Sequence, residues 1–214
     1  LTGELRGEHR FDDGAILRVR YSHDGRTLAM LASRLAAVRR ISLADGTHVD
    51  DPFPATPIAF ALSPDGARVA CGMRNGRLFV RELAAGTTRE IRAHSGVIWS
   101  LSFSPVDPGL LISSGGANGV AFWDLDSGLA CHNGSQTEAP VAQMQLSRDG
   151  RTWAAFTNDG VVLRDLEYHE RHVAGNLEHQ LARLGGQVSL PPSRERELRA
   201  WTAGVLARPW PRWR

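Results

Sequence analysis

Short segments in which apolar and polar residues alternate recur along the first three quarters of the chain. Four of them alternate with a period of two residues, which is typical of a β-strand with one buried face. These segments are 16–21, 58–62, 97–103 and 141–146. An Asp-Gly or Pro-Gly turn follows each one, and a turn of this kind between alternating segments predicts a hairpin. We therefore expect second, antiparallel strands at Thr27–Ala32, Arg68–Gly72, Leu110–Ser114 and Thr152–Thr157.

Further turns predict a third and a fourth strand in these units. The third strands are expected at 38–43, 78–83, 120–125 and 161–166. A weaker fourth strand is expected after Asp45-Gly46, Ala85-Gly86 and Ser127-Gly128. The pattern thus predicts three four-stranded antiparallel units and the first three strands of another.

The turn after each first strand begins with a serine, and these serines are evenly spaced. They are Ser22, Ser63, Ser104 and Ser147, at intervals of 41, 41 and 43 residues. A period near 40 built from short strands is the signature of a β-propeller, in which each four-stranded repeat is one blade. The predicted fold class is therefore all-β, a propeller of about four blades.

The third repeat contains the most specific motif. It reads Ala93-His94-Ser95-Gly96 before its first strand and ends Phe122-Trp123-Asp124-Leu125. This resembles the WD-repeat β-propeller family, and the resemblance spans residues 1 to about 166. It implies a buried hydrogen-bonded set made of His94, Ser114 (or its neighbour Ser113), Asn118 and Trp123. The other three repeats lack this set, so we expect them to be held mainly by apolar packing.

The repeats divide the chain at about 10–51, 52–92, 93–134 and 135–166, after an outer strand at 1–9. Residues 1–9 could complete the last blade and close a four-bladed ring. The alternative, which we favour, is that the chain is the C-terminal part of a larger propeller, commonly seven-bladed in the resembled family. An open array would leave apolar blade faces available for self-association.

The resemblance also suggests where a partner would bind. In that family, partner contacts often use the start of the innermost strand of each blade. The matching positions are Ala15, Leu17, Thr56, Ile58, Val97, Trp99, Pro140 and Ala142. Trp99 stands out because tryptophan is a favoured hot-spot residue, although it could instead pack between blades.

Residues 167–214 have a different pattern. Apolar residues recur at helical spacing from Val173 to Leu184 and again from Leu198 to Val205. The chain ends Pro209-Trp210-Pro211-Arg212-Trp213-Arg214, which is aromatic and basic. We expect a short helical, Trp/Arg-rich extension that packs on the propeller or serves as a docking peptide.

Composition offers little support for other function classes. A net charge of +2, with arginine as every basic residue, does not suggest a nucleic-acid partner, and no apolar run is long enough for a membrane span. Cys71 and Cys131 lack metal-ligand spacing, and His169-Glu170-Arg171-His172 is one residue too short for a His-Glu-x-x-His zinc site. We expect no catalytic constellation, metal or cofactor.

The sequence therefore predicts a non-catalytic scaffold that binds a protein or peptide through the loop face of a propeller. Its arginine-only basic composition favours a GC-rich bacterial source, and the free thiols favour the cytoplasm. The alternative is a regulatory region of a larger enzyme, such as a bacterial serine/threonine kinase.

Overall fold

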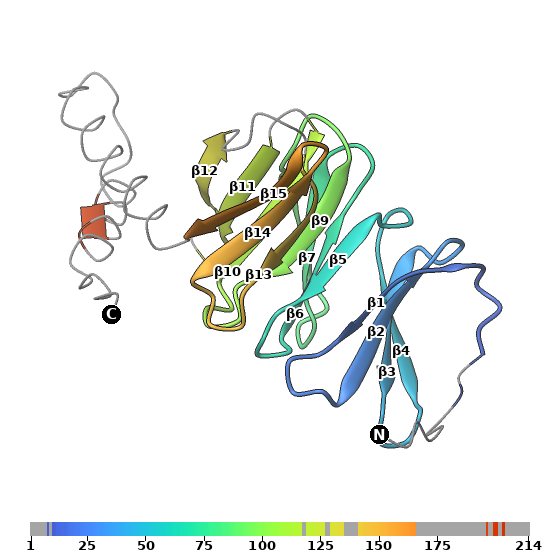
Figure 1. Cartoon of the computed structure of the whole chain (residues 1–214). Coiled ribbons are helices and arrows are strands. Elements are labelled where there is room, and N and C mark those ends of the chain that lie inside the picture. Colours follow the sequence, from blue (N-terminus) through green and yellow to red (C-terminus); the bar gives the residue numbers. More distant parts are fainter. Residues whose placement is uncertain are drawn as a thin grey trace, which may run out of the picture.

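The computed structural model describes residues 8, 10–116, 119–126, 129–134 and 141–165, and also 196, 199, 200 and 203; at 129–134 it describes the backbone alone. The described chain folds into four antiparallel sheets, each built from strands consecutive in sequence. Figure 1 shows the sheets following one another from the blue β1–β4 to the orange-brown β13–β15. The all-β fold of propeller-like blades is therefore confirmed.

The described strands form three sheets of four strands and one sheet of three. The first sheet contains β1 (Ile16–Tyr21), β2 (Thr27–Ala32), β3 (Ala37–Ser42) and β4 (His48–Pro52). The second contains β5 (Ala59–Leu62), β6 (Arg68–Gly72), β7 (Arg77–Glu82) and β8 (Thr88–Arg92). The third contains β9 (Ile98–Phe103), β10 (Leu110–Gly115), β11 (Gly119–Asp124) and β12 (Leu129–Gly134). The fourth contains β13 (Val141–Leu146), β14 (Thr152–Thr157) and β15 (Gly160–Asp165).

The Ser-x-Asp-Gly turns have one hydrogen-bonding plan. In the second sheet, the Ser63 hydroxyl donates to Asp65 Oδ1 at 2.5 Å and accepts the backbone N–H of Arg68 at 2.8 Å. Asp65 also accepts the N–H of Ala67, and Gly66 takes a φ of +70°, which suits glycine. The turns that begin at Ser22 and Ser147 repeat these bonds. The regular serine spacing therefore marks a repeated turn whose polar groups form hydrogen bonds with one another.

The third of these turns is built differently because it is longer. Ser104 accepts the N–H of Val106 at 3.4 Å, and Asp107 accepts the N–H of Gly109 at 2.9 Å. The hairpin still closes, since the N–H of Ser104 donates to the carbonyl of Leu110. An insertion in the turn is thus absorbed without loss of the sheet.

Three of the apolar cores lie between neighbouring sheets. The first joins β2 and β3 to β6 and β7, and includes Leu31 and Val69. The second packs Leu78 and Val80 against strands of the third sheet, including Leu111 and Trp123. Another packs the third sheet on the fourth and consists of Ile112, Val120, Phe122, Val141, Met144, Trp153 and Ala155. Burial between sheets rather than within one is what stabilises stacked repeats.

The two end sheets differ on their outward faces. On the first sheet, Phe11 packs over Met30 and Ile41. The guanidinium of Arg39 lies 5.3 Å from the Phe11 ring centroid and pairs with Asp13 and Asp50. Hydrogen bonding to Asp50 is the leading cause that raises the pKa of Arg39. The apolar packing expected for this repeat is therefore present, and an ion network lies beside it.

The outward face of the fourth sheet carries exposed apolar side chains. Phe156 is 43% exposed, Val161 is 56% exposed and Leu163 is 68% exposed. Phe156 and Val161 are direct cross-strand partners, while Leu163 pairs with Ala154. All four therefore project from the same side of the β14–β15 hairpin.

The predicted positions of the first, second and third strands differ from the structure by at most one residue at either end. The outer strand predicted at 1–9 lies outside the described residues, apart from residue 8. All four predicted third strands are shifted by one position, since β3, β7, β11 and β15 each begin one residue earlier. Gly119 pairs with Gly115 and Gly160 pairs with Thr157, so the turn glycine already belongs to the ladder. The helical extension predicted at 167–214 lies outside the described residues, apart from four isolated positions, and stays a prediction.

Candidate interaction site

The predicted partner-binding positions lie at the starts of the innermost strands β1, β5, β9 and β13. Among those described, Ala15, Leu17, Trp99 and Ala142 are exposed, and Thr56, Ile58 and Val97 are half-buried. Between them Ile98 and Val141 are buried. The exposed Leu17, Trp99 and Ala142 are each the extra residue of a β-bulge, where the regular alternation of the strand is interrupted. Pro140 lies outside the described residues.

Arg18 ties three of these strand starts together. Its Nε donates to the carbonyl of Ile58 at 2.9 Å, and its Nη2 donates to the carbonyl of Trp99 at 3.0 Å. One side chain of the first sheet thus forms hydrogen bonds with the backbone at the strand starts of the second and third sheets. Sequence reasoning missed Arg18, although a cation inside an alternating strand was a signal that could have found it.

Trp99 presents its indole to solvent while its backbone is held. The residue is 42% exposed, and its backbone carbonyl is the one that accepts a hydrogen bond from Arg18. In the β9–β10 ladder Ile98 pairs with Gly115 and Ser100 pairs with Ser114, so Trp99 is the extra residue of a β-bulge between these two pairs. An exposed aromatic whose backbone is held in this way provides contact area at little cost in conformational entropy.

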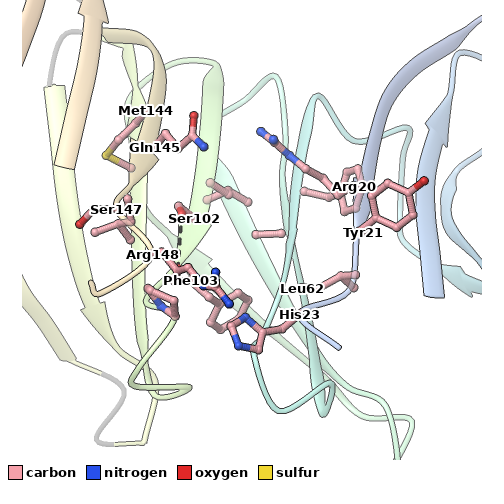
Figure 2. Close-up of a pocket in the computed structure, with 15 residues that line it drawn as sticks. Arg20, Tyr21, His23, Leu62, Ser102, Phe103, Met144, Gln145, Ser147 and Arg148 are labelled. Atoms are coloured by element: carbon pink, nitrogen blue, oxygen red, sulfur yellow. Dashed lines mark hydrogen bonds between the residues drawn. The ribbon is translucent and has the colours of Figure 1, made fainter. Parts of the chain in front are cut away.

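A cavity of about 460 Å³ opens toward the other end of the same strands (Figure 2). All four sheets contribute to its lining, for example through Tyr21, Leu62, Phe103 and Met144. Figure 2 shows the labelled side chains arranged around the space between the innermost strands. Sequence reasoning placed the site only at the strand starts, because the return turns carry no motif beyond their folding signal.

The charges around this space are mainly positive. Arg20, His23 and Arg148 line the cavity, and among the described residues no acidic side chain is part of its lining. Burial, and then repulsion from Arg20, lower the pKa of Arg18. The innermost strands therefore surround an electropositive region.

The predicted polar set of the third repeat forms around Ser113. The Nε1 of Trp123 donates to Ser113 Oγ at 2.8 Å, and His94 Nε2 lies 2.7 Å from the same oxygen. All three residues are buried. Burial lowers the pKa of His94 to about 4, against an opposing hydrogen bond with the Gly115 backbone. His94 is therefore neutral at pH 7, and its Nε2 can accept a hydrogen bond from the Ser113 hydroxyl.

The prediction of Ser114 in this set is corrected to its neighbour Ser113. Ser113 pairs with Ala121 and Ser114 pairs with Val120, so the two hydroxyls project from opposite faces of the sheet. Trp123 is two residues from Ala121 and lies diagonally across from Ser113 on the same face. Asn118, the fourth predicted member, lies outside the described residues.

The third repeat is also where the chain matches a known family. Residues 86–124 match the family described as WD domain, G-beta repeat. That span contains His94, Ser113 and Trp123, the residues whose hydrogen bonds are described above.

The chain contains a WD repeat.

Named relatives agree with this assignment. WD repeat-containing protein 3 of Mus musculus is 36% identical over 101 residues, which are 44% of this chain and 10% of that protein. Its Homo sapiens counterpart is 34% identical over 90 residues, or 40% of this chain and 9% of that protein. The guanine nucleotide-binding protein G(I)/G(S)/G(T) subunit beta-1 of Homarus americanus is 29% identical over 104 residues, which cover 46% of this chain and 30% of that subunit. The chain thus spans a tenth to a third of these relatives.

A solved structure supports the same fold. Hydrazine synthase of Kuenenia stuttgartiensis superposes with a TM-score of 0.63 at 20% identity, covering 78% of this chain and 50% of that one. At this identity the likeness concerns the arrangement of the sheets alone.

Side chains able to bind metal are scattered over the part of the chain that the structure describes. Among those residues, no group of three or more histidine, cysteine or acidic side chains is arranged to hold a metal ion. The His169 cluster lies outside them. No described helix is long and apolar enough to cross a membrane. Cys71 is buried, and burial raises the pKa of its thiol, so this thiol is unreactive.

Proposed function

We propose that the WD repeats of this chain bind a protein partner at the starts of their innermost strands, with Trp99 as the anchor. WD repeats and the likeness to a G-protein β subunit support a propeller that mediates protein interaction. The name of that relative describes it as one subunit of a larger protein, so it works within an assembly. We propose the same role for this chain.

The observation that carries the proposal is the exposure of the Trp99 indole at a position fixed by its neighbours. Trp99 is 42% exposed, and its backbone carbonyl accepts a hydrogen bond from Arg18. Ala15 and Leu17 of the first sheet are exposed at the corresponding strand start. A rigid aromatic with smaller apolar neighbours is the usual composition of an interface centre.

The proposal assigns this region a binding role without catalysis. The titratable groups with lowered pKa values are mostly turn carboxylates held by a neighbouring serine hydroxyl, such as Asp24 and Asp149. His94 is buried against Ser113 and Trp123. The pKa shifts of the turn carboxylates come mainly from these hydrogen bonds, and that of His94 comes from burial.

Partner capture by immobilised chain, read by quantitative mass spectrometry, tests the proposal. Trp99→Ala should reduce recovery of the specific partner about tenfold or more, as expected for a hot-spot residue. Phe156→Ala is the matched control, because Phe156 is also an exposed aromatic on a strand and is 43% exposed. Equal recovery with Trp99→Ala and the unchanged chain would remove Trp99 from the interface.

The regulatory alternative makes a different prediction. If this region regulates a larger enzyme, the coding sequence upstream of Leu1 encodes a catalytic domain such as a kinase. Sequencing that DNA decides between the two, and an upstream stretch without any catalytic domain would rule the alternative out.

A further inference from the structure

The cavity between the innermost strands is lined by positively charged side chains. The proposed partner binding at the strand starts does not involve these side chains. The lining residues able to carry charge are Arg20, His23 and Arg148, from the first and fourth sheets. Figure 2 shows Arg20 beside Tyr21, and shows His23 and Arg148 directed into the space between the sheets. A concave surface lined by one sign of charge concentrates the opposite sign.

These cations differ from arginines that serve the fold. Arg39 pairs with Asp13 and Asp50, and Arg68 pairs with Glu82 and Asp126. Over the ranges that the structure describes, neither Arg20 nor Arg148 forms an ion pair. Their guanidinium groups, each with five N–H donors, are therefore left for a ligand.

The nearest acidic residues in sequence are held within their own turns. Asp24 follows His23, and Asp149 follows Arg148, yet each accepts from its own turn serine at 2.6 Å and from a backbone N–H. Neither aspartate is part of the cavity lining. The turns thus hold the carboxylates outside while the neighbouring cations face the cavity.

Arg18 provides an independent sign that the region is electropositive. Its guanidinium donates to the carbonyls of Ile58 and Trp99, which are neutral acceptors and leave its positive charge in place. Burial is the larger cause that lowers the pKa of Arg18, and repulsion from Arg20 adds to it. An anion placed near Arg20 would relieve that repulsion.

We propose that this cavity binds a carboxylate-rich peptide segment, with Arg20 and Arg148 as paired anion contacts and His23 as an additional donor. The segment would belong to the protein partner, so the inference rests on the proposed function. About 460 Å³ is within the size range of ligand sites and accommodates a few residues. Phe103 and Met144 supply apolar surface beside the cations. Arginines recognise carboxylates by charge-assisted, often bidentate, hydrogen bonds.

Fluorescence anisotropy with the full chain tests the proposal. The probe is a labelled peptide of alternating glutamate and glycine, compared with a glutamine–glycine peptide of the same length. The glutamate peptide should bind at least about tenfold more tightly, and Arg148→Gln or Arg20→Gln should each weaken it about tenfold. Arg148→Lys should retain most of the affinity because it keeps the charge.

Arg92→Gln is the matched control, since Arg92 is an exposed arginine on the outer strand β8. It removes the same charge away from the cavity and should leave the affinity unchanged. Equal affinity for the two peptides, or an equal loss with Arg92→Gln and Arg148→Gln, would overturn the proposal. Circular dichroism should match for all variants, because Arg20 and Arg148 are exposed.

The proposed function and this inference can fail separately. If Trp99→Ala abolishes partner capture while the two peptides bind equally, the cavity proposal is wrong and the platform proposal stands. If the glutamate peptide binds through Arg20 and Arg148 but Trp99→Ala captures its partner normally, the strand-start platform is wrong and the cavity is the binding site.

Discussion

Trp123 donates its indole N–H to the hydroxyl of Ser113 at 2.8 Å. Ser113 lies on the neighbouring strand and pairs with Ala121, two residues before Trp123. The same hydroxyl contacts His94, so removing it affects two buried polar side chains. Ser113→Ala should lower the free energy of unfolding by about 2 to 4 kcal/mol, since each unsatisfied buried group costs about 1 to 3 kcal/mol. Urea unfolding measures this loss.

Ser114→Ala is the control for that substitution. Ser114 is also buried, but its hydroxyl has no hydrogen-bond partner within the described structure. Its removal should change stability by less than about 1 kcal/mol, because the alanine buries no unsatisfied group. Similar losses for the two variants would contradict the assignment of Ser113 to the set.

The neutral state of His94 predicts an acid-sensitive fold. Its folded pKa is about 4, whereas imidazole in an unfolded chain titrates near 6.5. The unfolded chain therefore binds the proton first, and stability should fall as pH drops from about 6.5 toward 4, by roughly 2 to 3 kcal/mol. The turn carboxylates act at lower pH, because hydrogen bonding holds the pKa of Asp65 below 3.8. Unfolding measured across pH 4.5 to 7 isolates the histidine.

His94→Gln should flatten this slope whatever it does to stability at pH 7. His48→Gln is the matched control, because His48 is exposed on β4 and its replacement should leave the slope in place. If His94→Gln kept the full dependence on pH, another group would have to be its source.

Two turn glycines with similar φ angles separate backbone strain from close packing. Gly66 and Gly76 have φ of +70° and +78°, so alanine is strained at both. A Cβ on Gly66 would meet nothing within 4 Å, whereas one on Gly76 would lie 1.9 Å from the carbonyl oxygen of His94. We expect Gly66→Ala to cost about 1 to 2 kcal/mol and Gly76→Ala well over 3 kcal/mol, as measured by thermal unfolding. Equal costs would mean that the turn moves freely away from His94.

The exposed end face of the fourth sheet predicts concentration-dependent association. Leu163→Ser should weaken self-association about tenfold, since removing an apolar side chain from an interface costs about 1.5 kcal/mol or more. Val106→Ser is the matched control, because Val106 is 68% exposed like Leu163 but lies in a turn. Sedimentation equilibrium compares them, and an equal effect of both substitutions would show that this face is not the contact.

Local patterns were enough to predict most strands of the propeller. Alternation located β1 and β13, and the self-bonded turn at Ser63 located β6. These features are local, because a hairpin is determined by its turn and by which residues alternate. Prediction was weakest where the choice between two neighbouring residues decides which face of the sheet a side chain occupies. Ser113 and Ser114 are such a pair, because they lie on opposite faces.

Contacts between distant segments could not be derived in the same way. The grouping of Arg20 with Arg148 depends on how the first sheet is placed against the fourth. Arg39 contacts Asp13 across a gap of 26 residues, which no periodicity marks. The starts of the inner strands were predicted from family resemblance, and whether partners use them stays a prediction. These relationships arise from the packing of sheets, which the repeat spacing does not encode.

The reach of Arg18 has a consequence for how the array opens. Stacked repeats usually exchange their amide hydrogens in independent cooperative units, each limited to neighbouring contacts. Here a side chain of the first sheet holds the carbonyls of Ile58 and Trp99, so it connects the first sheet to the third as well as to the second. Opening of the first sheet breaks bonds on both others at once. Protection against deuterium exchange in β1 and at the start of β9 should therefore change together. The two segments would then form one cooperative unit, although they belong to repeats that are not neighbours.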